Sequence, residues 1–209
     1  MSDFYPTDLD NHWAFVRGPA RLLAAASDQA YPSSIGDVIV TASGVTQYNA
    51  QSGWTDLGAT KTGVQISVNH AEETFDVDQI LGDIESQPTS WECSVQTALA
   101  ENTLEHFQVA WEGSDIATNT SPTPDERTMG YGQPTRYTRR RLAVLYKSDE
   151  DLIRAFVFNR VQLQPVESAI TFNKTGEQLS IPVQFKALAD TGVTDVKKRF
   201  FTIFEQVGT

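Results

Sequence analysis

The sequence predicts a mainly β protein, built as an antiparallel β-sandwich or barrel with one flanking α-helix. Short segments in which apolar and polar residues alternate recur along the chain, as in half-buried strands. Only residues 100–111 show a clear helical period. Strand and helix signals do not alternate in the way that a parallel sheet requires. The 209 residues include 11 Phe and 4 Trp, which suits one domain with a sizeable core.

The best strand signals lie between residues 64 and 97. We expect strands at 64–69, 75–78 and 91–97, with a turn at 70–73 that makes the first two an antiparallel hairpin. Each strand has one apolar side and one polar side. The polar sides carry Gln65, Ser67 and Asn69; Asp76 and Asp78; and Glu92, Ser94 and Gln96. None of these residues is a lysine or an arginine.

The remaining segments give weaker signals. The helix at 100–111 leads into a long loop at 112–136, rich in Thr, Ser, Pro and Gly, and loops of this length are usually functional or disordered. Residues 193–207 are compatible with a strand or a helix. Other strands are predicted at 19–26, 35–41, 137–146, 153–161, 168–172 and 178–188, with a loop at 44–53. The chain therefore divides into an N-terminal arm (1–17), a β domain (18–190) and a C-terminal segment (191–209).

The net charge of −11 is unevenly distributed. Residues 1–120 hold 17 acidic and three basic residues, whereas residues 121–209 hold 10 acidic and 13 basic residues. This pattern fits either an acidic protein with a basic loop region, or an acidic face kept free of cations beside a basic face that meets acidic partners. Nucleic-acid binding by the acidic half is disfavoured, because affinity for phosphate comes largely from Lys and Arg.

The sequence also indicates the cellular compartment in which the protein folds. No apolar run approaches the roughly 18 to 20 residues needed to span a bilayer, and the acidic start lacks the apolar region of a signal peptide. We therefore expect a protein that is made and folded in a cytoplasm. The single cysteine, Cys93, permits no internal disulfide.

The motifs that suggest chemistry fail on spacing. Residues 53–58 contain the two glycines of a phosphate-binding loop, but Lys61 and Thr62 come two positions late and a strand follows instead of a helix. The acidic residues from Asp76 onward have Leu81 where a calcium loop needs glycine. The three histidines are widely spaced, and Cys93 lies on the apolar side of its strand, as a core residue would. We expect no catalytic residue, no cofactor and no metal site.

An ordered set of short elements carries a resemblance. Residues 54–60 read Trp-Thr-Asp-Leu-Gly-Ala-Thr and lead into Gly-Val-Gln-Ile at 63–66. Asp-Gln at 78–79 and Leu-Ala-Glu-Asn-Thr-Leu at 99–104 follow in order. Later come three arginines at 139–141, Phe-Val-Phe-Asn-Arg-Val at 156–161, and Ile-Pro-Val-Gln-Phe-Lys-Ala-Leu-Ala-Asp at 181–190. Over roughly residues 19–190, the chain resembles the major tail tube proteins of long-tailed bacteriophages.

The resemblance implies a structural subunit of the virion tail, assembled in the host cytoplasm. Its hexameric rings would stack into a helical tube that conducts DNA into the host cell during ejection, with no chemistry of its own. The implied partners are further copies of the chain and other tail proteins, such as the tape measure, terminator and distal tail proteins. DNA would pass without specific binding. A conduit must not retain DNA, so we expect the cation-free polar sides of the three best strands to line the channel.

Assembly also requires contacts between subunits. The arm 1–17, the loop 112–136 and the segment 191–209 are candidates for stacking, because each carries aromatic or charged residues without a core of its own. The residues expected in these contacts are Trp13, Phe15, Arg127, Arg136, Arg139, Arg140 and Arg141. Two alternatives remain: the tube protein of a contractile injection machine, and a β-sandwich module that binds carbohydrate or a cell surface.

Overall fold

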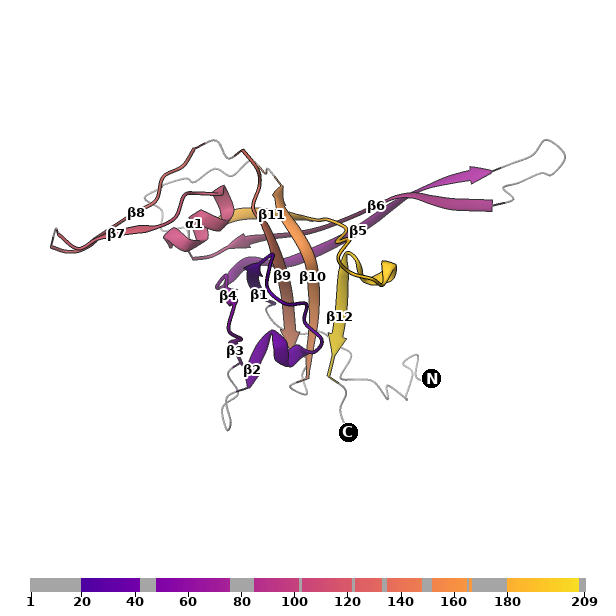
Figure 1. Cartoon of the computed structure of the whole chain (residues 1–209), viewed down its shortest axis with the longest axis horizontal. Helices are drawn as coiled ribbons and strands as arrows, with labels where there is room; N and C mark the ends of the chain where they lie inside the picture. The colour runs from indigo at the N-terminus through magenta and orange to yellow at the C-terminus, as the bar shows by residue number, and fades with distance from the viewer. Residues whose placement is uncertain are drawn as a thin grey trace, which may run out of the picture.

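The computed structural model describes residues 20–41, 48–75, 85–101, 103–121, 123–132, 135–147, 152–164, 166 and 180–206. Within these ranges the fold is an antiparallel, mainly β structure with a single α-helix, as predicted (Figure 1). The longer strands are β1 (Arg21–Ala26), β5 (Thr60–Phe75), β6 (Glu85–Leu99), β9 (Arg139–Lys147), β10 (Ile153–Gln164), β11 (Ile181–Ala187) and β12 (Phe201–Glu205), and the helix is α1 (Leu104–Trp111). The short elements are η2 (Ile35–Asp37), β2 (Ile39–Thr41), β3 (Tyr48–Ala50), β4 (Trp54–Asp56), β7 (Ala117–Asn119), β8 (Glu126–Thr128) and η3 (Val196–Lys198).

One eight-stranded sheet organises the chain, in the order β4-β1-β9-β10-β11-β6-β5. Strand β12 pairs with β10, so the sheet forks there. Residues 154–158 of β10 pair with β12, and residues 161–164 pair with β11. A register shift between Phe158 and Val161 separates the two stretches. Such bulges bend a strand and change which of its residues face each side.

Because of the bulge, the odd-numbered residues of β10 face one hydrophobic cluster before it and a different cluster after it. Before it, Ala155 and Val157 pack in a cluster with Leu23, Ala143 and Trp54. After it, Val161 and Leu163 pack in the larger cluster on the opposite face. That cluster joins buried residues of β1, β6, β9, β11 and α1, among them Leu22, Val95, Leu99, Val109, Leu142, Phe158, Val183 and Phe185. The inward-facing side of β11 and β6 is therefore apolar, which leaves their other side free for polar residues.

Strands β5 and β6 form a long hairpin that projects from the body (Figure 1). The turn predicted at 70–73 is wrong, because β5 continues through it to Phe75. His70 pairs with Trp91, and Glu73 pairs with Gln87. The side chains of residues 70–74 are all exposed. Because neither side of the strand packs on a core here, apolar and polar residues do not alternate, and the sequence gives no strand signal. Asp76 and Asp78 lie outside the described residues.

The helix begins four residues later than predicted. Thr103 caps it by accepting a hydrogen bond from the His106 N–H. The helix ends at Trp111, and the next residue, Glu112, has a left-handed φ of 52°. Ala100 lies before the helix, and its N–H donates to the Ala59 carbonyl at 2.8 Å. Asp, Ser and Thr caps mark helix starts more sharply than periodicity does.

Other boundaries also differ from the predictions. The loop at 112–136 contains a two-stranded hairpin, β7–β8, and Tyr48–Ala50 forms strand β3 within the predicted loop at 44–53. Residues 35–41 divide into η2 and β2. The ambiguous segment 193–207 contains η3 followed by β12. The strand predicted at 168–172 lies outside the described residues.

Candidate functional site

The predicted polar sides of β5 and β6 come together on one face of the sheet. Gln65 pairs with Gln96, Ser67 with Ser94, and Asn69 with Glu92. Directly paired residues of antiparallel strands point to the same side. Ser94 is half-buried and the other five side chains are exposed. The sequence therefore identified a real shared surface, formed by cross-strand pairs that it could not specify.

The same face continues across two further strands. Gln184 of β11 pairs with Gln96, and Gln164 of β10 pairs with Gln184. Four glutamines thus form one row across four adjacent strands. A second row runs through Ser67, Ser94, Lys186 and Gln162, and the exposed Arg139 of β9, which pairs with Gln162, borders it. We call this surface the polar face; its members are Gln65, Ser67, Asn69, Glu92, Ser94, Gln96, Gln162, Gln164, Gln184 and Lys186.

Strands β10 and β11 were missed as members of this face. The signal was present in the sequence, since Gln184 and Lys186 alternate with Val183 and Phe185. What the sequence could not show is that β11 lies next to β6, because the two strands are some 90 residues apart along the chain. The bulge in β10, which turns Gln162 and Gln164 to this side, has no sequence signature either.

The polar face contains one cation that the prediction did not include. The Lys186 Nζ lies 3.0 Å from Glu92 Oε1, so lysine and carboxylate neutralise each other within the face. Both side chains are partly exposed, and the pair adds little stability in such a setting. Its consequence is electrostatic: the remaining members of the face are neutral amides and hydroxyls.

The segment before β5 explains why two glycines occur there. Gly58 has a φ of +75°, and a Cβ on it would lie 2.6 Å from the Glu101 carboxyl. That carboxylate accepts a hydrogen bond from the Ala59 N–H at 3.2 Å. Gly63, with a φ of +76°, sits in the register shift that opens β5. Gly58 thus serves the connection between β4 and β5, and Gly63 serves the register shift at the start of β5.

The candidate arginines occupy different environments. Arg136 and Arg139 are exposed, and Arg127 of β8 pairs with Glu105 on α1. Arg140 is half-buried. Arg141 is only 3% exposed, so its assignment to contacts with another subunit is wrong. Its position on β9 turns the side chain toward a buried face of the sheet. Three consecutive arginines in the sequence do not indicate which of them points inward, because successive residues of a strand face opposite sides. Trp13 and Phe15 lie outside the described residues.

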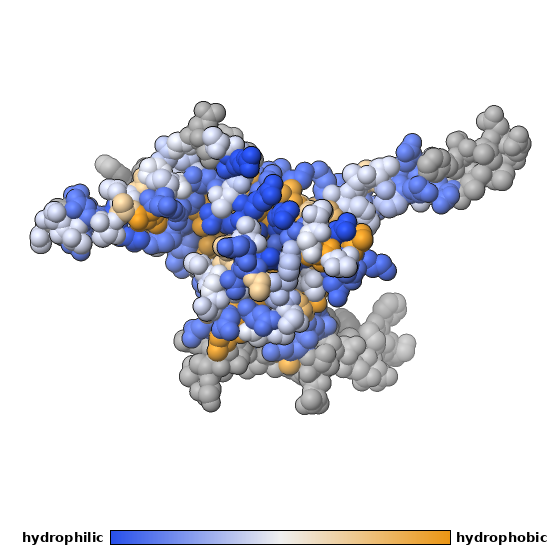
Figure 2. Space-filling model, in the orientation of Figure 1, coloured by the Kyte–Doolittle hydropathy of each residue, from blue (hydrophilic) through white to orange (hydrophobic). Residues whose placement is uncertain are grey.

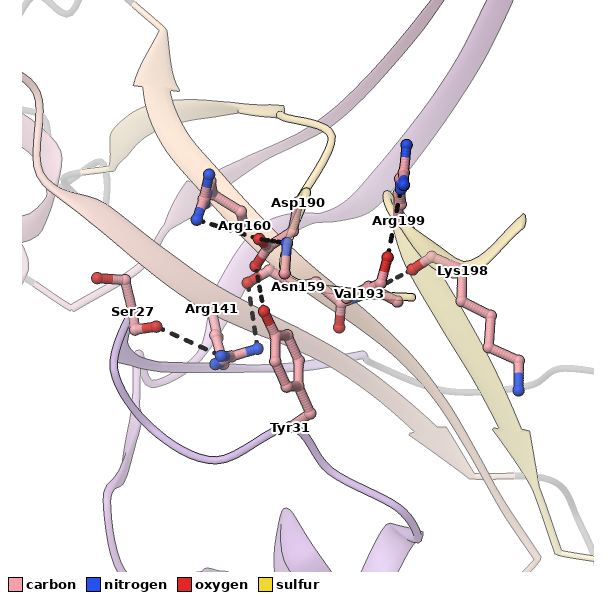
Figure 3. Close-up of polar contacts among 10 residues, drawn as sticks. Ser27, Tyr31, Arg141, Asn159, Arg160, Asp190, Val193, Lys198 and Arg199 are labelled. Carbon is pink, nitrogen blue, oxygen red and sulfur yellow. Dashed lines mark hydrogen bonds and ion pairs between the residues drawn. The ribbon is translucent and has the colours of Figure 1, made fainter. Parts of the chain in front are cut away.

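Arg141 belongs to a buried polar network (Figure 3). Its guanidinium lies 3.9 Å from the centre of the Tyr31 ring and donates to the carbonyls of Ser27 and Asn159. The Tyr31 hydroxyl donates to Asp190 Oδ2 at 2.8 Å, and Arg160 Nη2 lies 3.1 Å from Asp190 Oδ1. The network joins β9, β10 and the 27–31 loop to the start of the C-terminal segment.

The network also holds the next part of that segment. Asn159 Nδ2 donates to the Lys198 carbonyl at 2.6 Å, and the Asp190 N–H donates to the Arg199 carbonyl at 2.9 Å. Burial raises the pKa of the Asp190 carboxyl, but hydrogen bonds from Tyr31 and the Gly192 N–H, with Arg160 and Arg141 nearby, outweigh it and lower the pKa. Asp190 is therefore held ionised as the centre of the attachment.

The pair between Arg127 and Glu105 yields a pH prediction. Hydrogen bonds from Arg127, from the Glu105 N–H and from Thr103 lower the pKa of the Glu105 carboxyl from 4.5 to about 2. A lowered pKa means that the attachment of β7–β8 to α1 is complete above pH 4.5 and weakens as the pH falls toward 2. We expect Arg127→Ala to raise this pKa toward 4.5 in an NMR titration. Arg136→Ala is the control from the same loop, and a Glu105 pKa that stays near 2 in Arg127→Ala would refute the assignment.

The described residues offer no obvious catalytic or metal centre. No group of three or more His, Cys, Asp or Glu that could hold a metal ion occurs among them. Cys93 is buried, and burial raises the pKa of its thiol, which disfavours the reactive thiolate. Across the described parts of the chain, no helix is long and apolar enough to cross a membrane.

Comparisons with known families and curated proteins found no match. No protein-family model matches the chain, and no curated protein sequence matches it significantly. The resemblance therefore depends on the ordered residues quoted above.

Proposed function

We propose that this chain is the tube-forming subunit of a bacteriophage tail, a structural protein without catalytic activity. The observation that carries the proposal is the polar face. Four adjacent strands present amides and hydroxyls in register, and the one lysine among them is paired with Glu92. Within these four strands the surface offers DNA little uncompensated positive charge, and the exposed Arg139 lies only at its β9 border. Such a surface weakens the counterion release that drives phosphate binding.

The open edges of the sheet support self-assembly. Strand β5 pairs only with β6, and β4 pairs only with β1, among the described residues. Unpaired backbone edges are templates for another strand. If β5 of one copy meets an edge of the next, the polar faces of successive copies join into one continuous wall. Repetition of this head-to-tail contact closes a ring when the rotation allows, and the resemblance implies a hexamer.

The projections of the molecule suit contacts between rings. The β5–β6 hairpin and the β7–β8 hairpin extend from opposite sides of the body (Figure 1). The first carries exposed carboxylates at Glu72, Glu73 and Glu85, and the second carries exposed Arg127. In this proposal, rings stack through these projections, and the tape measure, terminator and distal tail proteins complete the tail. The virion is then the final location, after assembly in the host cytoplasm.

Two alternatives use the same fold. A tube protein of a contractile injection machine would share the polar face and the open edges. A carbohydrate-binding module is favoured only by Trp91, which is 54% exposed and stacks on His70 with ring centres 5.2 Å apart. Exposed aromatic rings suit sugar binding, but this pair lies on the hairpin side opposite the polar face.

Electron microscopy of the purified full chain tests the proposal. We expect rings, or tubes with a central channel, at raised protein concentration, and a sedimentation coefficient that increases with concentration. A protein that stays monomeric in sedimentation at millimolar concentration, yet binds to a glycan array in a Trp91-dependent manner, would refute the tube subunit and support the binding module.

A further inference from the structure

An apolar groove lies between the projecting hairpin and the C-terminal segment. It has a volume of about 210 Å³ and is lined by Val68, Trp91, Glu92, Cys93, Lys197, Phe200 and Phe201. Val68 pairs with Cys93 across β5 and β6, so both point to the core side of the hairpin, away from the polar face. Figure 2 shows apolar surface in this region, where the C-terminal segment approaches the hairpin.

Two open strand edges border the groove. Pairing between β11 and β6 ends at Ser94, and no described strand pairs with that edge of β6 over residues 85–93. Strand β12 follows β11 along the same edge of β10, and its other edge has no described partner. The hairpin bends away from β12 (Figure 1). The sheet thus leaves a gap at the place where one more strand would fit.

The side chains at this gap are unusually apolar for a surface. Val68 is 52% exposed and Trp91 is 54% exposed, and Phe200 and Phe201 are half-buried on the opposite wall. Phe200 and Phe201 pack directly against the larger core cluster. An apolar patch that continues into the core and lies beside open backbone edges is the combination used in strand addition, where main-chain hydrogen bonds and side-chain pockets act together.

We propose that this groove is the docking site for the N-terminal segment of a second copy of the chain, residues 1–19, added as an extended strand. The inference rests on the self-assembly proposed above and names one of its contacts. Trp13 and Phe15 are two positions apart, so in a strand they point to the same side and enter the groove together. The backbone of the segment pairs with the open edge of β6 or β12.

Charge and length favour this occupant. Residues 1–19 contain Asp3, Asp8 and Asp10 against one basic residue, Arg17. The groove is lined by Lys197 and by Glu92, and the Glu92 carboxylate pairs with Lys186, which leaves Lys197 to meet a carboxylate of the segment. Nineteen extended residues reach roughly 60 Å, which is more than the diameter of a domain of this size. The segment can therefore reach a neighbouring copy, and such a contact is head-to-tail, as rings and stacks require.

The native Cys93 permits a direct test in the full chain. It is the only cysteine and lies on the groove wall. Asn11→Cys or Arg17→Cys places a second thiol on the strand side shared by Trp13 and Phe15, without removing either ring. Oxidation is carried out at alkaline pH, because burial raises the pKa of the Cys93 thiol. We expect a ladder of disulfide-linked dimers, trimers and larger species on non-reducing gels, absent when Cys93→Ser is added.

Matched variants test whether the groove is what brings the two thiols together in the cross-linked ladder. Val68→Asp is expected to reduce the ladder at least tenfold. Val40→Asp, at a position that is 43% exposed in β2, is the control and should leave the ladder unchanged. Circular dichroism of both variants checks that they are folded, and a Lys197→Glu variant gives a milder probe, expected to weaken cross-linking in a salt-dependent manner.

The outcomes separate this contact from the tube itself. A ladder without rings or tubes in the microscope supports the docking and contradicts the tube function. Rings or tubes without any ladder from either position overturn the docking and leave the tube function standing. A cross-link that forms only within single chains, at all protein concentrations, also overturns the proposal, because the segment then occupies the groove of its own copy.

Discussion

Replacing Asp190 with alanine is expected to lower the free energy of unfolding by about 2–3 kcal/mol, the usual contribution of hydrogen bonds to a buried charged group. Water can rehydrate the partly exposed Arg160 and Tyr31, which keeps the cost below that of a fully buried ion pair. Asp190 is 2% exposed and accepts from Tyr31, from Arg160 and from the Gly192 N–H. Its loss leaves Arg160 and the Tyr31 hydroxyl without their shared acceptor. Denaturant unfolding followed by circular dichroism measures the difference.

The control is Asp195→Ala. Asp195 is exposed and caps η3 by accepting from the Lys197 N–H. We expect a change of about 0.5–1 kcal/mol, the cost of losing an exposed cap. Asp190→Asn is informative as well, since it keeps an acceptor for Tyr31 but removes the charge. Equal stability of Asp190→Ala and Asp195→Ala would show that the network does not hold the C-terminal segment.

The same network predicts how stability depends on acid. The folded state lowers the pKa of Asp190 below its ordinary value of 3.8. The unfolded chain therefore binds this proton more readily, and the stabilisation is fully present above pH 3.8 and is lost as the pH falls through the folded value. Asp190→Asn should remove that part of the acid dependence, and the difference between the two unfolding curves below pH 4 measures it.

The sequence predicted the strands best where one side of the strand is buried. Val64 and Ile66 pack against the core while Gln65 and Ser67 are exposed, so burial imposes the alternation that was recognised. Residues 70–74 are exposed on both sides of the hairpin, and there the period is lost although the strand continues. The predicted turn at 70–73 failed for that reason.

The candidate site was predictable only in part, because it depends on strand order. Six of its residues were identified from two strands that are joined by a hairpin, and hairpin partners are the commonest neighbours in a sheet. Gln184 and Lys186 belong to the polar face because β11 pairs with β6. That pairing is long-range in the sequence and could not be predicted from it. Arg141 shows the opposite error: charge alone suggested a contact surface, whereas the fold buries it over the Tyr31 ring.

A cation placed on the polar face should make the tube retain DNA. Gln96 is exposed at the centre of the face, between Gln65 and Gln184. A lysine there has no free carboxylate nearby, since Glu92 is paired with Lys186. We expect Gln96→Lys to change stability by less than about 0.5 kcal/mol, as surface substitutions usually do. If rings are hexameric, each ring then gains six cations that face the channel.

The expected result is strong, salt-dependent DNA binding by assembled tubes. About six phosphate contacts change affinity on the order of a thousandfold between 50 and 200 mM salt, whereas tubes of the unmodified chain should bind little DNA at either concentration. Co-sedimentation of tubes with labelled DNA measures the difference. Gln96→Glu is the matched control on the same face and should bind no more DNA than the unmodified tube.

A second control distinguishes the channel from the outer wall. Val40→Lys adds the same charge to an exposed position of β2, which pairs with β3 outside the eight-stranded sheet. DNA bound through an outer wall remains accessible to nuclease, whereas DNA held inside a channel is protected. Gln96→Lys tubes should therefore protect the DNA that they retain, and Val40→Lys tubes should not. If Gln96→Lys tubes bound DNA in a nuclease-sensitive manner, the polar face would lie on the outside and the channel would be lined by other strands.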